Sequence, residues 1–121
     1  MKYLIALSAF LATAAAWDIT IYEHANSGGW SQSWSNSWNT NQKILLSGRY
    51  NDGASSFVFN GNRNGLNQKV TSITLYKHYD ANGNCSGQMG YSCGSWSVNQ
   101  ISAANNDQLS CIQVKYHFAG C

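Results

Sequence analysis

The segment NDGASS at residues 51–56 returns near the C-terminus as NDQLSC at residues 106–111. We call these segments the first and second polar motifs. In both, an Asn-Asp pair is followed by a serine three residues after the aspartate. Their carboxylate, amide and hydroxyl oxygens are the kind of ligand that a hard cation such as Ca²⁺ prefers. One copy would be typical of an ordinary polar turn, but two copies indicate an internal repeat.

A second landmark recurs together with the polar motifs. Tyr22 is followed seven residues later by Gly29, and Tyr76 is followed at the same distance by Gly83. Each of these Tyr-x6-Gly elements stands about 30 residues ahead of its polar motif, and the two halves are offset by 54 to 55 residues. Halves that share their landmarks in the same order are expected to fold alike.

Alternation of apolar and polar residues predicts a fold made of strands. The expected strands cover residues 18–22, 44–46, 56–59, 70–76, 96–98 and 112–118. Residues 77–83 are expected to form a turn, and residues 84–94 a Cys- and Gly-rich inserted loop. No stretch after the N-terminal segment carries a helical stripe. The class is therefore all-β, with about four strands per half, and two such Greek keys can pack face to face as a sandwich.

The N-terminus has the features of a secretory signal. Lys2 precedes a largely apolar run over residues 3–12, and small residues continue to Ala16. The apolar run is too short to span a bilayer. We expect a signal peptide at residues 1–16 and a secreted, extracellular domain at residues 17–121. Within that domain, the first Greek key would cover about residues 17–61 and the second about residues 68–121.

The exported chain would carry almost no net charge. Loss of Lys2 leaves six Lys and Arg residues against five Asp and Glu residues. So small a charge argues against nucleic acid or an anionic membrane as the main partner, because both require clustered basic residues.

Four cysteines lie in the second half, and none of them forms a closely spaced pair typical of zinc ligands. An even number in an exported chain predicts two disulfides, for which three connectivities are open. The cysteines are Cys85, Cys93, Cys111 and Cys121.

Together these landmarks resemble the βγ-crystallin family, specifically its microbial calcium-binding branch. The family's Tyr-x6-Gly-x-Ser element is matched at Tyr22, Gly29 and Ser31. Its motif Asn/Asp-Asn/Asp-x-x-Ser/Thr-Ser is matched in every defined position at residues 51–56. The resemblance covers essentially the whole exported chain and implies two Greek keys packed as a βγ-crystallin-like sandwich.

The resemblance also implies two Ca²⁺ sites at one end of that sandwich. In the family, the second-position side chain of each motif goes to one ion, while the third-position carbonyl and fifth-position hydroxyl go to the other. The residue after each hairpin tyrosine adds a backbone carbonyl. The implied ligand residues are Glu23, Asp52, Gly53 and Ser55 from the first half, and Lys77, Asp107, Gln108 and Ser110 from the second.

Two departures from the family pattern suggest a disulfide pairing. In the family, the last serine of the motif hydrogen-bonds to the folded hairpin of its own half. Here that serine is replaced by Cys111, and the hairpin's own serine by Cys85. The resemblance therefore implies a Cys85–Cys111 bond and leaves Cys93 to pair with Cys121. The rival Cys85–Cys93 pair would join Cys111 to Cys121, which the last strand holds apart at about 3.3 Å per residue.

Three tryptophans spaced four residues apart allow another interpretation. Trp30, Trp34 and Trp38 could form a flat carbohydrate platform that stacks on cell-wall polysaccharide, although such residues more often cap a small core.

Signatures of catalysis are lacking in the sequence. There is no Gly-x-Ser-x-Gly element, and a glycosidase pair would have to be Asp52 and Asp107, which calcium binding explains better. Glu23, His24 and Arg49 could serve a small secreted ribonuclease, but no spacing rule supports that trio. We therefore predict a non-enzymatic, monomeric, calcium-binding protein with an extracellular stress or structural role. The alternative is a secreted antimicrobial toxin or effector that binds the cell-wall polysaccharide or membrane of competitors.

Overall fold

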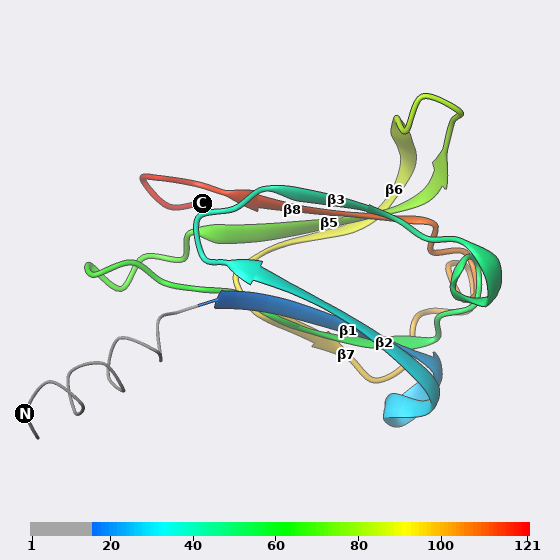
Figure 1. Ribbon diagram of the computed structural model, residues 1–121. Helices are drawn as coiled ribbons and strands as arrows, with labels where there is room; N and C mark the ends of the chain where they lie inside the picture. Colours follow the sequence, from blue (N-terminus) through cyan, green and yellow to red (C-terminus); the bar gives the residue numbers. More distant parts are fainter. Residues whose placement is uncertain (1–15) are drawn as a thin grey trace, which may run out of the picture.

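Figure 1 shows a computed structural model of the chain, which describes residues 16–121. Two four-stranded antiparallel sheets make up this part of the chain, and the predicted all-β class is confirmed. Two short 3-10 turns, η1 (Ala25–Ser27) and η2 (Gly48–Tyr50), lie between strands. The strands are β1 (Ala16–His24), β2 (Gly28–Ser37), β3 (Gln42–Leu45), β4 (Ser56–Asn60), β5 (Thr71–Tyr79), β6 (Cys85–Cys93), β7 (Trp96–Val98) and β8 (Cys111–Tyr116).

Apart from Ala16, the predicted signal peptide lies outside the described residues. Within residues 16–121, no helix is long and apolar enough to cross a membrane.

Each half of the chain supplies four strands, but the halves do not form one sheet each. One sheet has the order β2-β1-β4-β7 and the other the order β3-β8-β5-β6. Strand β3 of the first half therefore pairs with β8, and β7 of the second half pairs with β4. This exchange of the third strand interlocks the two Greek keys, and Figure 1 shows the sheets packed face to face.

The core lies between the two sheets and follows the alternation seen in the sequence. On β1, Trp17, Ile19 and Ile21 are completely buried, while the residues between them are partly exposed. On β8, Ile112 and Val114 are buried in the same way. Because side chains of a strand point to opposite faces in turn, this period places the apolar residues of both sheets in one interior.

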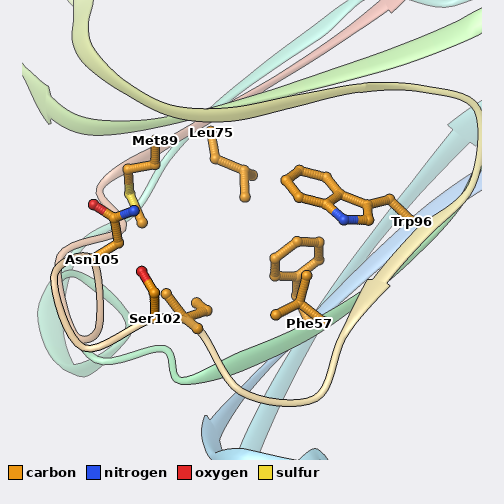
Figure 2. A pocket seen from close by; sticks show the side chains of 8 residues that line it. Phe57, Leu75, Met89, Trp96, Ser102 and Asn105 are labelled. Atoms are coloured by element: carbon orange, nitrogen blue, oxygen red, sulfur yellow. The ribbon is translucent and has the colours of Figure 1, made fainter.

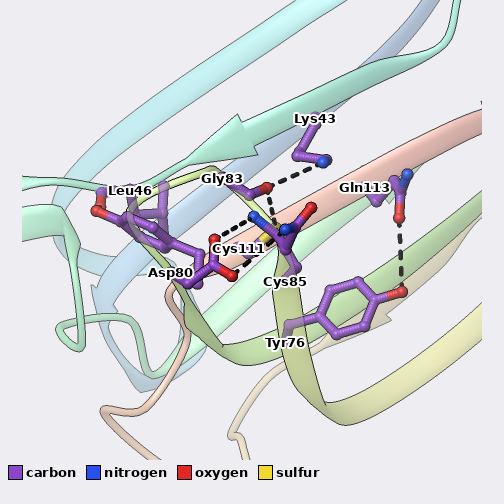
Figure 3. The surroundings of a disulfide bond; sticks show 10 residues. Lys43, Leu46, Tyr76, Asp80, Gly83, Cys85, Cys111 and Gln113 are labelled. Carbon is purple, nitrogen blue, oxygen red and sulfur yellow. Dashed lines mark hydrogen bonds between the residues drawn. A yellow bond between two sulfur atoms is a disulfide. The ribbon is translucent and has the colours of Figure 1, made fainter.

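The second hairpin is more regular than the sequence predicts. Strand β5 continues through Lys77 to Tyr79, so the turn expected at residues 77–83 begins only at Asp80. Residues 84–94 are not an inserted loop, because most of them form β6, which pairs with β5. The turn is held by the Asp80 carboxylate, which accepts hydrogen bonds from the backbone N–H groups of Asn82 and Asn84, each at 2.9 Å. Figure 3 shows this turn beside one of the disulfides.

The last strand is shorter than expected. Strand β8 ends at Tyr116, and Phe118, which the alternation assigns to the strand, lies beyond it and is 85% exposed.

The glycine of the second folded hairpin is Gly87, not Gly83. In the first hairpin Gly29 has a φ of +75°, and a β-carbon there would lie 2.8 Å from Cδ2 of His24. Gly87 has a φ of +72°, and a β-carbon there would lie 3.1 Å from Cδ2 of His78. Gly83 belongs instead to the turn after β5. The expected match of Gly83 to Gly29 is wrong because the second hairpin reaches its fold four residues later.

Two disulfides fasten the second half. Cys85 is bonded to Cys111 with their Cα atoms 6.1 Å apart, and Cys93 is bonded to Cys121 with their Cα atoms 5.7 Å apart. This is the pairing that the resemblance implies. Figure 3 shows the first bond joining β6 to the start of β8. The hairpin of β5 and β6 is thereby tied to the strand that follows the second polar motif.

The tryptophans of β2 do not form a surface platform. Alternate residues of β2 turn inward, and Trp30 and Trp34 pack against the core. Trp38 lies just beyond β2 and meets the ring of Tyr116 edge-on, with the ring centroids 5.2 Å apart. The predicted three-residue platform is wrong, because the strand period that aligns Trp30 with Trp34 also turns both toward the interior.

Candidate metal site

The two polar motifs meet at one end of the sandwich. The backbone N–H of Asp52 donates to the carbonyl of Leu109 at 3.0 Å, and the N–H of Asp107 donates to the carbonyl of Ala54 at 3.3 Å. In each bond the second residue of one motif reaches the fourth residue of the other. The pair of bonds therefore relates the motifs by an approximate two-fold symmetry.

The same symmetry ties each motif to the tyrosine of its own half. The N–H of Ser55 donates to the carbonyl of Tyr22, and the N–H of Ser110 donates to the carbonyl of Tyr76, both at 2.9 Å. The chain directly after each tyrosine therefore runs beside a motif. Those next residues, Glu23 and Lys77, are the two from which the sequence analysis expects carbonyl ligands.

Both motif aspartates adopt the left-handed backbone conformation. The φ angle is 58° at Asp52 and 56° at Asp107, in a region where Asp and Asn are better tolerated than most other residues with a β-carbon. The matching angles show that the two copies are folded alike.

The side chains are exchanged between the motifs. The hydroxyl of Ser110 donates to Oδ1 of Asp52 at 2.9 Å, and the hydroxyl of Ser55 donates to Oδ1 of Asp107 at 3.2 Å. Each fifth-position hydroxyl therefore lies against the second-position carboxylate of the other motif. That carboxylate and that hydroxyl are the two side chains that the resemblance assigns to one shared ion.

The predicted ligand residues separate into two groups in the structure. A depression in the surface is lined by Glu23, Gly53, Ser55 and Asp107, with Asp52 at its side. This group contains the complete first ligand set. In the second ligand set, the hydroxyl of Ser110 contacts the carboxylate of Asp52. The side-chain amide of Gln108 points elsewhere and donates to the carbonyl of Ala104 at 2.9 Å.

Two buried oxygens lie outside the predicted ligand set. Oδ1 of Asn51 and Oδ1 of Asn106 are both buried, and neither accepts a hydrogen bond within residues 16–121. They occupy the first position of the two motifs. Buried polar atoms are normally satisfied by protein or by ordered water. Their recurrence at the same position of both motifs is the one signal by which the sequence points to them.

The chemistry of the donors fits a hard cation. Each set has one carboxylate, and its other oxygens are neutral hydroxyls and carbonyls, which suit Ca²⁺ better than a transition metal. Within residues 16–121, no three side chains of His, Cys, Asp or Glu are grouped in a way that could hold a metal ion by themselves. The two histidines that stand two residues after the tyrosines, His24 and His78, lie in separate hairpins.

The residues of the ribonuclease alternative lie at the same depression. Glu23, His24 and Arg49 all line it, and Oε1 of Glu23 is 3.5 Å from Nε2 of His24. Two of the three have structural partners. Oε1 of Glu23 accepts the backbone N–H of Trp30 at 3.3 Å. Arg49 donates to the hydroxyl of Tyr50 at 3.2 Å, an interaction that raises the pKa of Arg49.

The fold defined by these observations is that of the βγ-crystallin domains. A βγ-crystallin domain from Clostridium beijerinckii matches with a TM-score of 0.54 and 18% identity, over 80% of this chain and 95% of that one. A βγ-crystallin domain from Flavobacterium johnsoniae matches with a TM-score of 0.53 and 20% identity, over 83% of this chain and 96% of that one.

A third similar structure is a clostrillin double mutant in complex with nickel, in which two serines are replaced by histidines. It matches with a TM-score of 0.54 and 16% identity, over 81% of this chain and 97% of that one. No protein-family model matches the chain, and no curated protein matches it by sequence. The likeness to the three solved structures is one of fold.

Proposed function

We propose that this protein binds two Ca²⁺ ions at the paired polar motifs and acts as a calcium-stabilised, non-enzymatic structural or stress protein outside the cell. The observation that carries the proposal is the reciprocal contact of Ser110 with Asp52 and of Ser55 with Asp107. Two unrelated polar turns would have no reason to exchange hydroxyl and carboxylate groups in this symmetric way.

The first site would be held by the Asp107 carboxylate and the Ser55 hydroxyl, with the carbonyls of Gly53 and Glu23. A β-carbon at Gly53 would lie 2.5 Å from the carbonyl oxygen of Arg49, so only glycine fits at this position without a shift. The backbone at Gly53 therefore packs directly against the backbone at Arg49.

The second site would be held by the Asp52 carboxylate and the Ser110 hydroxyl, with the carbonyls of Gln108 and Lys77. A bound cation supplies positive charge to a carboxylate that is otherwise balanced only by a hydroxyl hydrogen bond. The ligands of each site come from both motifs, and only the folded chain brings the motifs together. Cation binding therefore stabilises the folded state.

The affinity is expected to be modest. Each site has a single carboxylate, and ligand charge is a main determinant of Ca²⁺ affinity, so we expect a Kd of roughly 10⁻⁵ to 10⁻³ M. Isothermal titration calorimetry of the purified protein with CaCl₂ is the direct test. Absence of a binding heat at millimolar Ca²⁺ would remove the proposal.

A matched set of variants tests which carboxylates are used. Asp52→Asn and Asp107→Asn should each weaken one site by more than the other, because each aspartate belongs to a single set. Asp18→Asn is the control, since Asp18 lies on β1 and accepts a hydrogen bond from Asn60 at 2.9 Å, outside both sets. Equal loss of affinity in all three variants would show that only general charge is being measured.

The nickel complex of the engineered clostrillin gives limited support here. It shows that a structure with this fold was obtained with a bound metal, but that protein carries two introduced histidines. The present proposal rests on oxygen donors, so Ca²⁺ should bind more tightly than Ni²⁺ in the same titration.

The proposal excludes catalysis by Glu23, His24 and Arg49. Incubation of the protein with single-stranded RNA in EDTA is expected to leave the RNA intact, because Arg49 and Glu23 hydrogen-bond to Tyr50 and to the N–H of Trp30. Cleavage that His24→Ala abolishes would overturn this part of the proposal. Secretion is tested separately, by N-terminal sequencing of protein from the culture medium, which should begin at Trp17.

A further inference from the structure

An open apolar cavity of about 200 Å³ lies between the sheets on the side of the second half. Its walls come from four strands and the segment after β7, and Figure 2 shows the side chains around it. The apolar wall residues are Phe57, Leu75, Met89, Trp96, Val98 and Ile101.

The cavity arises from a difference between the two hairpins. On β2 the residues paired with Ile21 and Ile19 are Gln32 and the inward-turned Trp34. In the second half the strand that corresponds to β2 is β6, and it places only small residues at these positions. There Gly90 is paired with Leu75, and Ser92 is paired with Ile73. At these two positions β6 therefore lacks the bulk that β2 supplies, and the β6 side chain that packs against the core is Met89.

Trp96 takes up part of the vacant space. Its ring lies across β6, and a β-carbon at Gly90 would be 2.6 Å from Cη2 of Trp96. The same ring meets Phe57 edge-on, with the ring centroids 4.9 Å apart, so its position is fixed from two sides. The remaining space lies beside the indole and reaches the buried side chains of Phe57 and Leu75, each 2% exposed.

Two polar side chains stand at one side of the cavity. Ser102 and Asn105 line it from the segment that leads into the second polar motif, and Figure 2 shows the Ser102 hydroxyl on the cavity side. Within residues 16–121 neither side chain makes a hydrogen bond, whereas the backbone carbonyl of Ser102 accepts the N–H groups of Asn105 and Asn106. The backbone of this segment is thus held while its polar side chains remain available.

We infer that this cavity is a binding site for a compact apolar molecule of about single-ring size that carries one hydrogen-bonding group. Apolar walls offer water few partners, and an apolar cavity of about 150 Å³ is large enough to bind benzene. The hydroxyl or carbonyl of the molecule would meet Ser102 and Asn105 at the polar side. The site is separate from the polar motifs and its occupation does not depend on calcium.

Phenol and benzene serve as probes of the site. Methyl-labelled protein is titrated with each compound in EDTA and followed by ¹H–¹³C NMR. The methyl signals of Leu75, Met89, Val98 and Ile101 should shift in a saturable manner, while that of Leu66, which is 81% exposed in a distant loop, should not. Signals that stay in place up to the solubility limit of both probes would overturn the inference.

Two exposed neighbouring positions provide a matched pair of variants. Ser102→Phe places a ring at the side of the cavity and should weaken phenol binding about tenfold or more, since the space is then occupied. Ala103→Phe adds the same ring one residue away, where the side chain does not line the cavity, and should leave binding unchanged. Equal shifts in both variants would show that the probes bind the surface without specificity.

Asn105→Ala tests the polar side of the site with little change in shape. Loss of one hydrogen bond should weaken phenol binding by about two- to tenfold and leave benzene binding unchanged. A parallel loss for both probes would contradict the assignment of Asn105 to the ligand's polar group. Circular dichroism of each variant identifies any that is not folded, and the Asn105→Ala comparison still decides if Ser102→Phe fails to fold.

Discussion

Ser27 and Ser56 meet in the first half at the place where Cys85 and Cys111 are joined in the second. The N–H of Ser27 donates to Oγ of Ser56 at 3.2 Å, and Oγ of Ser56 donates to the carbonyl of His24 at 2.6 Å. The strand registers establish the match, because His24 is paired with Gly28 and His78 with Ser86.

The serine that Cys85 replaces is therefore Ser27, and not Ser31 as the resemblance implies. Ser31 is paired with Tyr22, whereas the partner of Tyr76 is Gln88. The expectation that a cysteine pair replaces two neighbouring polar residues holds in the structure. The serine that corresponds to Cys85, however, lies four residues before the one expected. A polar contact in one half has become a covalent bond in the other.

The double variant Cys85→Ser/Cys111→Ser should fold but with lower stability. The bond joins residues 26 apart, for which the chain-entropy estimate of the stabilisation is about 3.5 kcal/mol. A serine at 111 can occupy the same type of buried site that Ser56 occupies, so no polar group need be left without a partner. Urea unfolding in EDTA measures the loss.

Peptide mapping without reduction is the control for that experiment. The wild type should give fragments that join Cys85 to Cys111 and Cys93 to Cys121, and the variant should give only the second. A fragment joining Cys111 to Cys121 would contradict both the pairing and the register of β8.

Calcium should raise the melting temperature. A ligand that binds only the folded state stabilises it by RT ln(1 + [L]/Kd), which is about 2.7 kcal/mol at a hundredfold excess over Kd. For a domain of this size that corresponds to roughly 10 °C. Thermal scans in EDTA and in saturating CaCl₂ that coincide would show that the ion is not a folding ligand, and MgCl₂ at equal ionic strength is the control.

A double-mutant cycle should show that the motifs exchange their ligands. Because Ser110 lies against Asp52, the effects of Ser110→Ala and Asp52→Asn on Ca²⁺ affinity should be non-additive by about 0.5–3 kcal/mol. Ser110→Ala with Asp107→Asn should be nearly additive, since these residues of one motif belong to different sites. Calorimetry on the three single variants, the two double variants and the wild type decides, and coupling confined to pairs within one motif would reverse the assignment.

The loss of stability caused by three glycine-to-alanine substitutions should follow how closely the new β-carbon approaches its neighbours. Gly29→Ala should be the most destabilising, because its β-carbon would lie 2.6 Å from Cβ of Glu23 in addition to the left-handed φ. Gly87→Ala should cost less, and Gly83→Ala least, since its β-carbon would meet only Cδ1 of Leu45, at 3.4 Å. The φ penalty alone is about 1–2 kcal/mol. Urea midpoints in EDTA give the order, and a larger cost at 83 than at 87 would restore Gly83 as the hairpin glycine.

Asp80 should make stability depend on acid pH. Backbone hydrogen bonds from Asn84 and Asn82 lower the pKa of Asp80 below its ordinary value of 3.8. The ionised form is thus favoured in the folded state, so its contribution is present above pH 3.8 and is lost as pH falls through the lower folded pKa. Wild type should exceed Asp80→Asn in stability at pH 6, and the difference should shrink toward pH 2. A difference that is constant with pH would contradict this origin.

Local pattern was sufficient to predict most of the strands and the repetition of the polar motif. Period-two alternation identifies the buried faces of β1, β4, β5 and β8, because a side chain's face follows from its parity along the strand. The repeat of Asn-Asp and serine at the same positions identifies two equivalent loops. The all-β class and the two four-stranded halves follow from these features of the sequence.

The arrangement in space required the tertiary structure. Nothing local indicates that β3 leaves its own half to pair with β8, or that Trp30 and Trp34 face the core. The hairpin glycine was misplaced because the spacing of seven residues fits Gly83, while the register of β5 on β6 puts the fold at Gly87.

For the candidate site too, some features follow from the sequence and others only from the tertiary structure. The sequence determined which oxygens are present, because the motif residues are read directly from it. Only the fold decided that Ser55 reaches Asp107 across 52 residues and Ser110 reaches Asp52 across 58. Contacts between residues so far apart in the chain depend on how the two sheets pack, since strand period and turn propensity act only over neighbouring residues.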